Sequence, residues 1–114
     1  MVNAVGMSSQ TAEILASLMP DMQRIVPADG HVVLFGSRAR GDERADSDFD
    51  LLVLLDRKGR ATWNDHDNIV FPLNMEFWGR GLTVNTIMQT NEEWQAKKAT
   101  PLYENILNEG VKVL

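Results

Sequence analysis

Apolar residues near the start of the chain recur with a helical period. Four of them are spaced three and four residues apart: Leu15, Leu18, Met22 and Ile25. Such spacing is typical of the buried face of an amphipathic helix, and Ser8 or Ser9 is suited to cap its N-terminus. Because proline removes a helical N–H and clashes with the preceding turn, we expect either a kink at Pro20 or two shorter helices, with Pro20 in the first turn of the second.

Two apolar runs in the first half of the chain predict buried strands. Residues 31–35 (HVVLF) are bounded by Gly30 and Gly36, and residues 49–55 (FDLLVLL) follow a polar, charged segment over 37–47. Short apolar runs between turn residues are typical of strands in the interior of a sheet. The pattern therefore predicts a strand, a polar excursion and a second strand.

The second half of the chain alternates between helical and strand patterns. Apolar residues over 61–78 have mostly helical spacing, interrupted by Pro72. The β-branched segment 82–88 (LTVNTIM) predicts a third strand, and a Thr-Pro pair at 100–101 opens a last helix, which Gly110 ends. The order α-β-β-α-β-α predicts an α+β fold, with helices packed on a small mixed sheet.

Composition and charge narrow the classes of function. A chain of 114 residues fits a single domain over 1–114, and the absence of cysteine excludes disulfides, thiol chemistry and a cysteine zinc site. A formal charge of -5 argues against a broad nucleic-acid surface. Because no basic leader and no apolar run of membrane-spanning length is present, we expect a cytoplasmic protein with no membrane partner.

The stretch over 36–50 (GSRARGDERADSDFD) carries the candidate chemistry. Asp48 and Asp50 begin the second predicted strand, where residues i and i+2 point to the same face about 7 Å apart. Both carboxylates can therefore reach one metal site. Mg²⁺ is commonly held by one or two carboxylates together with substrate phosphates, and a pair of such ions supports displacement at phosphorus.

Small and basic residues precede these carboxylates. Gly36 lets the backbone approach a ligand closely, and Ser37 can present its hydroxyl and neighbouring N–H groups to phosphate oxygens. Arg38 and Arg40 are weaker candidates for the same role. Acidic residues outnumber arginines between Ser37 and Asp50, so a phosphate ligand makes electrostatic sense here only together with bound cations.

Other interpretations of this stretch fit less well. Residues 46–50 look like the opening of an EF-hand loop, but Leu51 stands where glycine is required. Residues 36–41 have the glycine spacing of a P-loop, but Asp42 and Glu43 stand where lysine and a hydroxyl residue are required. A plain solvated connection between strands remains the structural alternative. The two histidines lack metal-ligand spacing, and we assign them no role.

The stretch resembles the signature of the minimal nucleotidyltransferase domains in the DNA polymerase β-like superfamily. That signature is Gly-Ser, ten residues and Asp-x-Asp, and it stands here as Gly36-Ser37, residues 38–47 and Asp48-Phe49-Asp50. The resemblance is strong over residues 31–55. It implies the polymerase β-like palm fold and a transferase that moves a nucleoside monophosphate, AMP from ATP, to an acceptor hydroxyl.

The resemblance also implies roles for individual residues. Gly36 and Ser37 would hold the β- and γ-phosphates, and Asp48 and Asp50 would be the catalytic ligands of two Mg²⁺ ions. Family members usually carry a third carboxylate on the next strand, where this chain has Asn85. Asparagine can offer an oxygen to a metal but neither negative charge nor a base. Glu76 is the alternative candidate for that third position.

Three functions follow from this pattern. The first is a nucleotidyltransferase whose acceptor or substrate-binding domain is supplied in trans, because one domain leaves little surface for an acceptor. The resemblance allows a helical HEPN-type partner, with this chain as antitoxin. The second is a module with weakened or lost turnover that binds nucleotide or a partner protein, which Asn85 favours. The third, an antibiotic-modifying transferase, is disfavoured because it needs an additional substrate-binding region.

Overall fold

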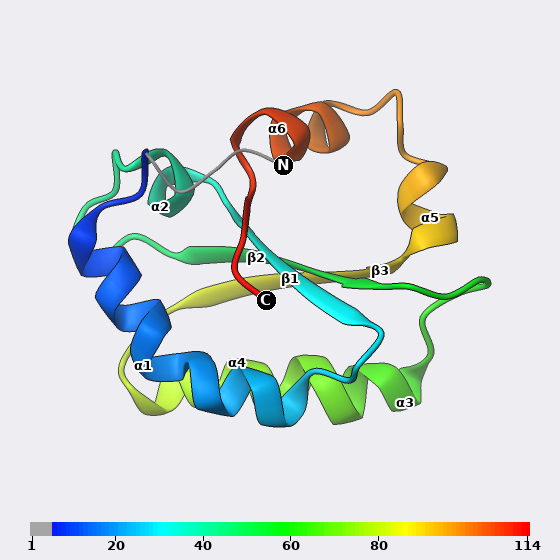
Figure 1. Cartoon of the computed structure of the whole chain (residues 1–114), viewed down its shortest axis with the longest axis horizontal. Coiled ribbons are helices and arrows are strands. Elements are labelled where there is room, and N and C mark those ends of the chain that lie inside the picture. The colour runs from blue at the N-terminus through cyan, green and yellow to red at the C-terminus, as the bar shows by residue number, and fades with distance from the viewer. Residues whose placement is uncertain (1–5) are drawn as a thin grey trace.

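The computed structural model describes residues 6–114. The elements follow one another in this order: α1 (Ser9–Ile25), β1 (Gly30–Phe35), α2 (Ser37–Arg40), β2 (Phe49–Leu55), α3 (Trp63–Asp65), the π-helix η2 (His66–Val70), α4 (Phe71–Gly79), β3 (Val84–Thr90), α5 (Asn91–Gln95), α6 (Pro101–Glu109) and β4 (Val111–Lys112). Within the described residues, no helix is both long and apolar enough to cross a membrane. This element order confirms the predicted α+β class (Figure 1).

Helix α1 begins at the predicted cap. The Ser8 side chain accepts a hydrogen bond from the Thr11 backbone N–H, and three of the four periodic apolar residues are buried. The expectation of two shorter helices is wrong, because α1 continues through Pro20. Figure 1 shows that the helix bends along its course, as expected where proline leaves one bond of the helical ladder unmade.

The sheet has the strand order β3-β2-β1-β4. Strand β1 runs antiparallel to both β2 and β4, whereas β2 and β3 are parallel, so the sheet is mixed as predicted. Strand β2 has the predicted bounds, and β3 begins two residues later than the 82–88 pattern indicated. The two-residue strand β4 was not predicted, because so short a segment has no alternation to detect.

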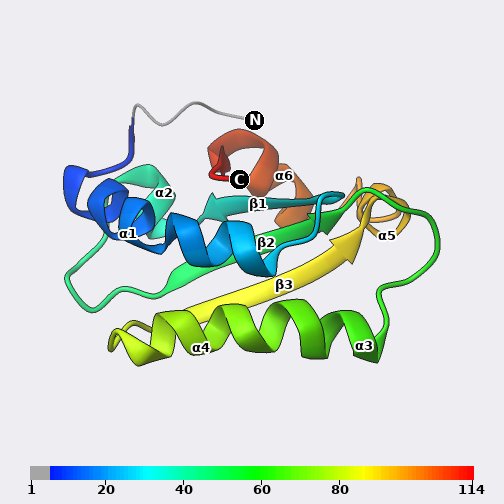
Figure 2. The same cartoon turned by 60° about the horizontal axis from the view of Figure 1, so that its bottom comes forward.

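The predicted helix over 61–78 is continuous where a break was expected. Pro72 is the second residue of α4 and follows directly on a segment that is already helical, so its missing N–H falls within the rod, next to the irregular turn. The interruption takes the form of the π-helix η2 just before it, in which the Phe71 N–H donates to the His66 carbonyl oxygen five residues back. The chain therefore passes from α3 to α4 as one rod, which lies along the lower edge of Figure 2.

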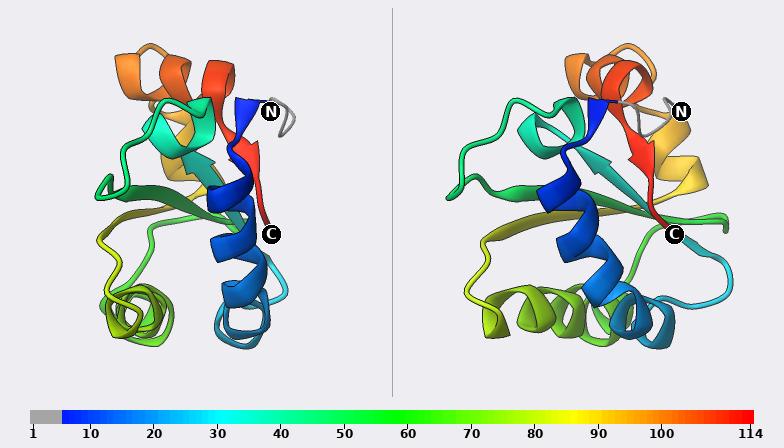
Figure 3. Two further views of the ribbon diagram at one scale, coloured as in Figure 1. Left: turned by 90° about the vertical axis from the view of Figure 1, so that its left-hand side faces the viewer. Right: turned by 60° about the vertical axis from the view of Figure 1, so that its left-hand side comes forward.

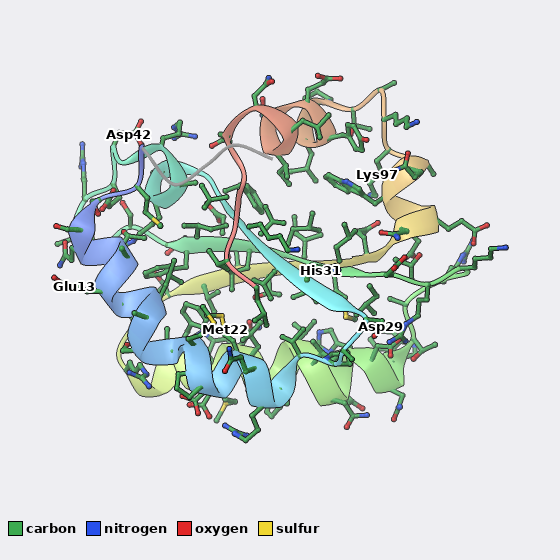
Figure 4. The ribbon with its side chains drawn as sticks, viewed as in Figure 1. Glu13, Met22, Asp29, His31, Asp42 and Lys97 are labelled. Carbon is green, nitrogen blue, oxygen red and sulfur yellow. The ribbon has the colours of Figure 1, made fainter. Side chains whose placement is uncertain are left out.

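The helices form two layers with the sheet between them (Figure 3). Helices α1 and α4 pack on one face against Phe49, Leu51 and Val53 of β2. Side chains of α5 and α6 pack on the other face against Val33 and Leu52. Met22 is fully buried on the sheet-facing side of α1 (Figure 4). Alternate residues of β2 therefore face different layers, which gives Asp50 the same face as Leu52.

Two phenylalanines of the α4 helix test this arrangement. Phe77 is fully buried and its ring lies 5.3 Å from that of Phe49, whereas Phe71 is half-exposed. Because Phe77→Ala leaves a cavity between helix and sheet, we expect it to lower the free energy of unfolding by about 3 to 5 kcal/mol. Phe71→Ala should cost about 1 kcal/mol or less. Urea unfolding of both variants is the measurement, and equal losses would contradict the assigned burial.

Candidate active site

Asp48, Asp50 and Asn85 meet at the start of two parallel strands. Asp48 directly precedes β2, Asp50 is its second residue, and the strand register places Asn85 opposite Asp50. The Asn85 Nδ2 group donates to Asp48 Oδ2 at 3.1 Å and to Asp50 Oδ1 at 3.2 Å. The two carboxylates predicted to share a site therefore point toward one side-chain amide.

The two carboxylates differ in their surroundings. The Thr83 hydroxyl donates to Asp48 Oδ1, and Asp48 is exposed to solvent. Burial raises the pKa of the Asp50 carboxyl above its ordinary value, and the charges of Asp48 and Glu109 raise it further. The Asn85 hydrogen bond and the Arg40 charge oppose this rise. Asp50 is thus a carboxylate at which an added cation would be stabilising.

Gly36, directly after the neighbouring strand β1, lies against the Asp50 side chain. Residue 36 follows the end of β1, and Phe35 is paired with Asp50 across the sheet. Gly36 has a φ of 77°, a value that side chains disfavour, and a Cβ atom there would overlap Asp50 Oδ2. Only glycine therefore allows the backbone of residue 36 to lie this close to the Asp50 side chain.

The other candidate phosphate ligands lie in and around α2. Ser37 is half-buried and begins this helix, and Arg40 is its exposed last residue. The Arg40 guanidinium contacts two carboxylates, Asp42 at 3.2 Å and Glu109 at 2.7 Å. Glu109 Oε2 also accepts the Gly36 N–H at 3.0 Å. Glu109 was not predicted, and no local pattern near the end of the last helix marks it.

Arg38 has a structural position that differs from its predicted one. Its side chain is buried, with a relative exposure of 1%. The guanidinium donates to the carbonyl oxygens of Ala45 and Ser47 and to the Thr11 hydroxyl, and it stacks 4.3 Å from the centre of the Phe49 ring. These contacts engage the guanidinium within the fold. Arg38 instead fixes the chain on both sides of Asp48.

A hydrogen-bond network ties this same loop to α1. Glu43 Oε2 accepts from the hydroxyls of Ser8 and Thr11, and these contacts hold the pKa of the Glu43 carboxyl below its ordinary value, the Ser8 bond contributing most. The Thr11 hydroxyl in turn accepts from Arg38. These hydrogen bonds thus anchor the charged loop between β1 and β2 to α1, a few residues before Asp48.

Glu76 does not supply the third carboxylate. It lies on α4 and accepts a hydrogen bond from Arg24 of α1 at 3.2 Å, in the helical layer on the face of the sheet opposite to Asp50. Of the two candidates for the third position, Asn85 is therefore the one that lies beside Asp48 and Asp50. In residues 6–114, no group of three or more His, Cys, Asp or Glu side chains is arranged to hold a metal ion.

The donor set nevertheless fits Mg²⁺ in part. Two carboxylates and one amide converge, and an asparagine side chain can present its oxygen in place of its nitrogen. The remaining ligands would come from substrate phosphates and water, as is usual for this ion. The larger hollows, of about 550 and 660 Å³, are lined by neither Asp48 nor Asp50.

Comparison with known proteins identifies the fold as that of a nucleotidyltransferase. A chain of a toxin–antitoxin crystal structure containing AMP-PNP matches with a TM-score of 0.60 and 16% sequence identity, over 88% of this chain and 72% of that one. An inferred protein adenylyltransferase of Methanocaldococcus jannaschii is 30% identical over 79 residues, which are 69% of this chain and 72% of the relative. The nucleotidyltransferase domain model matches residues 15–113. The chain belongs to the nucleotidyltransferase domain family, which confirms the resemblance to the minimal domains of this type.

Replacement of Arg38 tests its position in the loop. Because Arg38→Ala leaves the Ala45 and Ser47 carbonyl groups without their guanidinium donor and a void beside the buried Phe49 ring, we expect a loss of about 3 kcal/mol or more in unfolding free energy. Arg44 is exposed in the same loop, and Arg44→Ala removes the same charge at a cost of about 0.5 kcal/mol or less. Thermal and urea unfolding measure the stability of both variants. A loss for Arg38→Ala as small as that for Arg44→Ala would contradict the structural role of Arg38.

Proposed function

We propose that this chain transfers AMP from Mg²⁺-bound ATP to a hydroxyl group of a partner protein. The observation that carries the proposal is the meeting of Asp48, Asp50 and Asn85 beside the close-fitting Gly36. Membership of the nucleotidyltransferase family supplies the reaction class. The experiments below test the nucleotide, the metal and the acceptor of this reaction. We expect the protein to act in the cytoplasm.

The chain's own residues divide into two groups in this reaction. Asp48 and Asp50 would hold two Mg²⁺ ions, with the Asn85 side chain rotated to offer its oxygen. Bound Mg²⁺ supplies neutralisation of phosphate charge. The Gly36 N–H, the Ser37 hydroxyl and Arg40 would bind the β- and γ-phosphates, because they lie on the adjoining end of β1 and on α2. Catalysis would rest mainly on positioning and charge neutralisation.

The transfer itself is a substitution at phosphorus. The acceptor oxygen forms a bond to the α-phosphorus of ATP, and the bond from that phosphorus to the oxygen bridging the α- and β-phosphates breaks. Pyrophosphate leaves with the electron pair, and the acceptor proton passes to solvent. Asn85 cannot accept this proton, so we expect slow turnover.

Three observations favour a protein as the acceptor. The relative from Methanocaldococcus jannaschii has a name that describes transfer to proteins, and the structural neighbour comes from a toxin–antitoxin complex. The α4 helix also exposes Phe71, Met75 and Trp78, at positions i, i+4 and i+7, with exposures of 53%, 49% and 49%. Such an apolar stripe suits a helical partner. We propose a HEPN-type toxin as that partner, with this chain as its antitoxin.

A second candidate function is a binding module without turnover. Asn85 favours it, because the third carboxylate is absent from the position opposite Asp50. Such a module would retain the nucleotide site and the partner surface and would act by association alone. The two candidates differ in whether the partner acquires an AMP group.

Incubation with ATP labelled at the α-phosphate tests the first function. We expect label to pass to a protein in the lysate of the source cells when Mg²⁺ is present, and to be lost in the Asp48→Ala, Asp50→Ala double variant. The reason is that this variant removes both carboxylates of the site. An Asp46→Ala, Asp67→Ala variant is the matched control, because both residues are exposed and the charge change is equal.

The outcomes separate the two functions. Transfer that persists in the Asp48, Asp50 variant would refute the assigned site. Absence of transfer by the natural chain, together with Mg²⁺-dependent nucleotide binding, would favour the binding module. In that case Asn85→Asp is the next variant, because it provides a third carboxylate. If Asn85 is the reason why the natural chain transfers no AMP, this variant should transfer label above background.

A further inference from the structure

The Glu109 carboxylate contacts two of the groups that the proposed function assigns to nucleotide phosphates, the Gly36 N–H and the Arg40 guanidinium. Glu109 Oε2 accepts a hydrogen bond from the Gly36 N–H at 3.0 Å and an ion-paired hydrogen bond from Arg40 Nη1 at 2.7 Å. These donors come from a segment more than 60 residues earlier in the chain. A phosphate oxygen requires the same N–H and guanidinium donors, so Glu109 presents to them the chemistry of a bound anion.

The position of Glu109 on its own helix is unfavourable. It is the last residue of α6, and the last turn of that helix contains no basic residue. Carbonyl groups at a helix C-terminus disfavour a negative charge nearby. The Glu109 side chain is nevertheless only 19% exposed. The contacts with Gly36 and Arg40 therefore explain why the Glu109 carboxylate lies here, because its own helix does not stabilise it.

Glu109 also adds charge beside the proposed metal ligands. Its carboxylate is among the charges that raise the pKa of Asp50, together with Asp48. Without cations, the carboxylates of Asp48, Asp50 and Glu109 lie near the Arg40 guanidinium, which also pairs with Asp42. A triphosphate approaching Gly36 would meet Glu109 at close range, and like charges disfavour their joint presence.

We propose that Glu109 is an internal competitor for the phosphate position and that nucleotide binding displaces its side chain from Gly36 and Arg40. This inference rests on the proposed function, because it takes these two residues as phosphate ligands. Displacement requires only rotation of the side chain. The backbone around Glu109 is fixed, since Ile106 and Val111 are buried and β4 pairs with β1. Affinity for nucleotide is then set partly by the strength of the Glu109 contacts.

Calorimetric titration with AMP-PNP and Mg²⁺ tests the competition. Because Glu109→Ala removes the competing carboxylate, we expect it to bind the nucleotide about tenfold more tightly than the natural chain, the order of one charged hydrogen bond. Glu109→Gln keeps the shape and loses the charge, so we expect a smaller gain in the same direction. It also serves if the alanine variant fails to fold, as judged by its melting curve.

Glu104 provides the matched control on the same helix. It is exposed and lies about one turn before Glu109, so Glu104→Ala and Glu104→Gln change the net charge equally without freeing Gly36 or Arg40. These variants should bind like the natural chain. An equal gain in both pairs would show a general charge effect and would overturn the proposal.

The remaining outcomes separate this proposal from the proposed function. Weaker or unchanged binding by both Glu109 variants would overturn the competition, and weaker binding would indicate that Glu109 helps to hold the ligand. If no variant binds AMP-PNP, the competition and the nucleotide site are both refuted. If the Glu109 variants bind AMP-PNP more tightly but no labelled AMP is transferred, the competition is supported and the proposed transfer reaction is refuted.

Discussion

The parallel pairing of β2 with β3 is the constraint on which the site depends. This register places Asn85 opposite Asp50, and a slip of one residue would turn Asp50 and its neighbour Asp48 toward the apolar layer of α1 and α4. The large apolar side chains of β2 oppose such a slip, because they fill the cores on both faces. Burial of the strand thus fixes the position of its two carboxylates, and the chemistry of the site follows from the packing of the sheet.

Arg38 extends that constraint into the polar loop. A buried guanidinium is costly unless its donors are used, and here they bind the carbonyl groups of Ala45 and Ser47 just before Asp48. The loop that precedes β2 is therefore tied by hydrogen bonds to α2 through this side chain. Negative charge accumulates at its end, where Asp48, Asp50 and Glu109 lie near one another. Under the proposed function, bound cations would relieve this repulsion between like charges.

The sequence predicted regular elements well where its patterns are local. The bounds of β2 and α6 match, because an apolar run and a Thr-Pro start need no tertiary information. Helix α5 could have been found from its capping box, Thr90 with Glu93. Arg38 and Arg40 lie two residues apart and have opposite roles, one buried and one exposed, which only packing decides. Glu109 escaped prediction because its partner Gly36 is distant in sequence.

Paramagnetic NMR tests the central claim most directly, namely that the carboxylates of β2 form the metal and nucleotide site. Mn²⁺ replaces Mg²⁺ at oxygen-rich sites and broadens the signals of nearby nuclei. In the ¹⁵N-labelled chain with AMP-PNP, we expect Mn²⁺ to broaden first the amide signals of Gly36, Asp48, Asp50 and Asn85. Broadening confined to other acidic segments, such as the π-helix η2 around Asp67, with these four signals unchanged, would contradict the account.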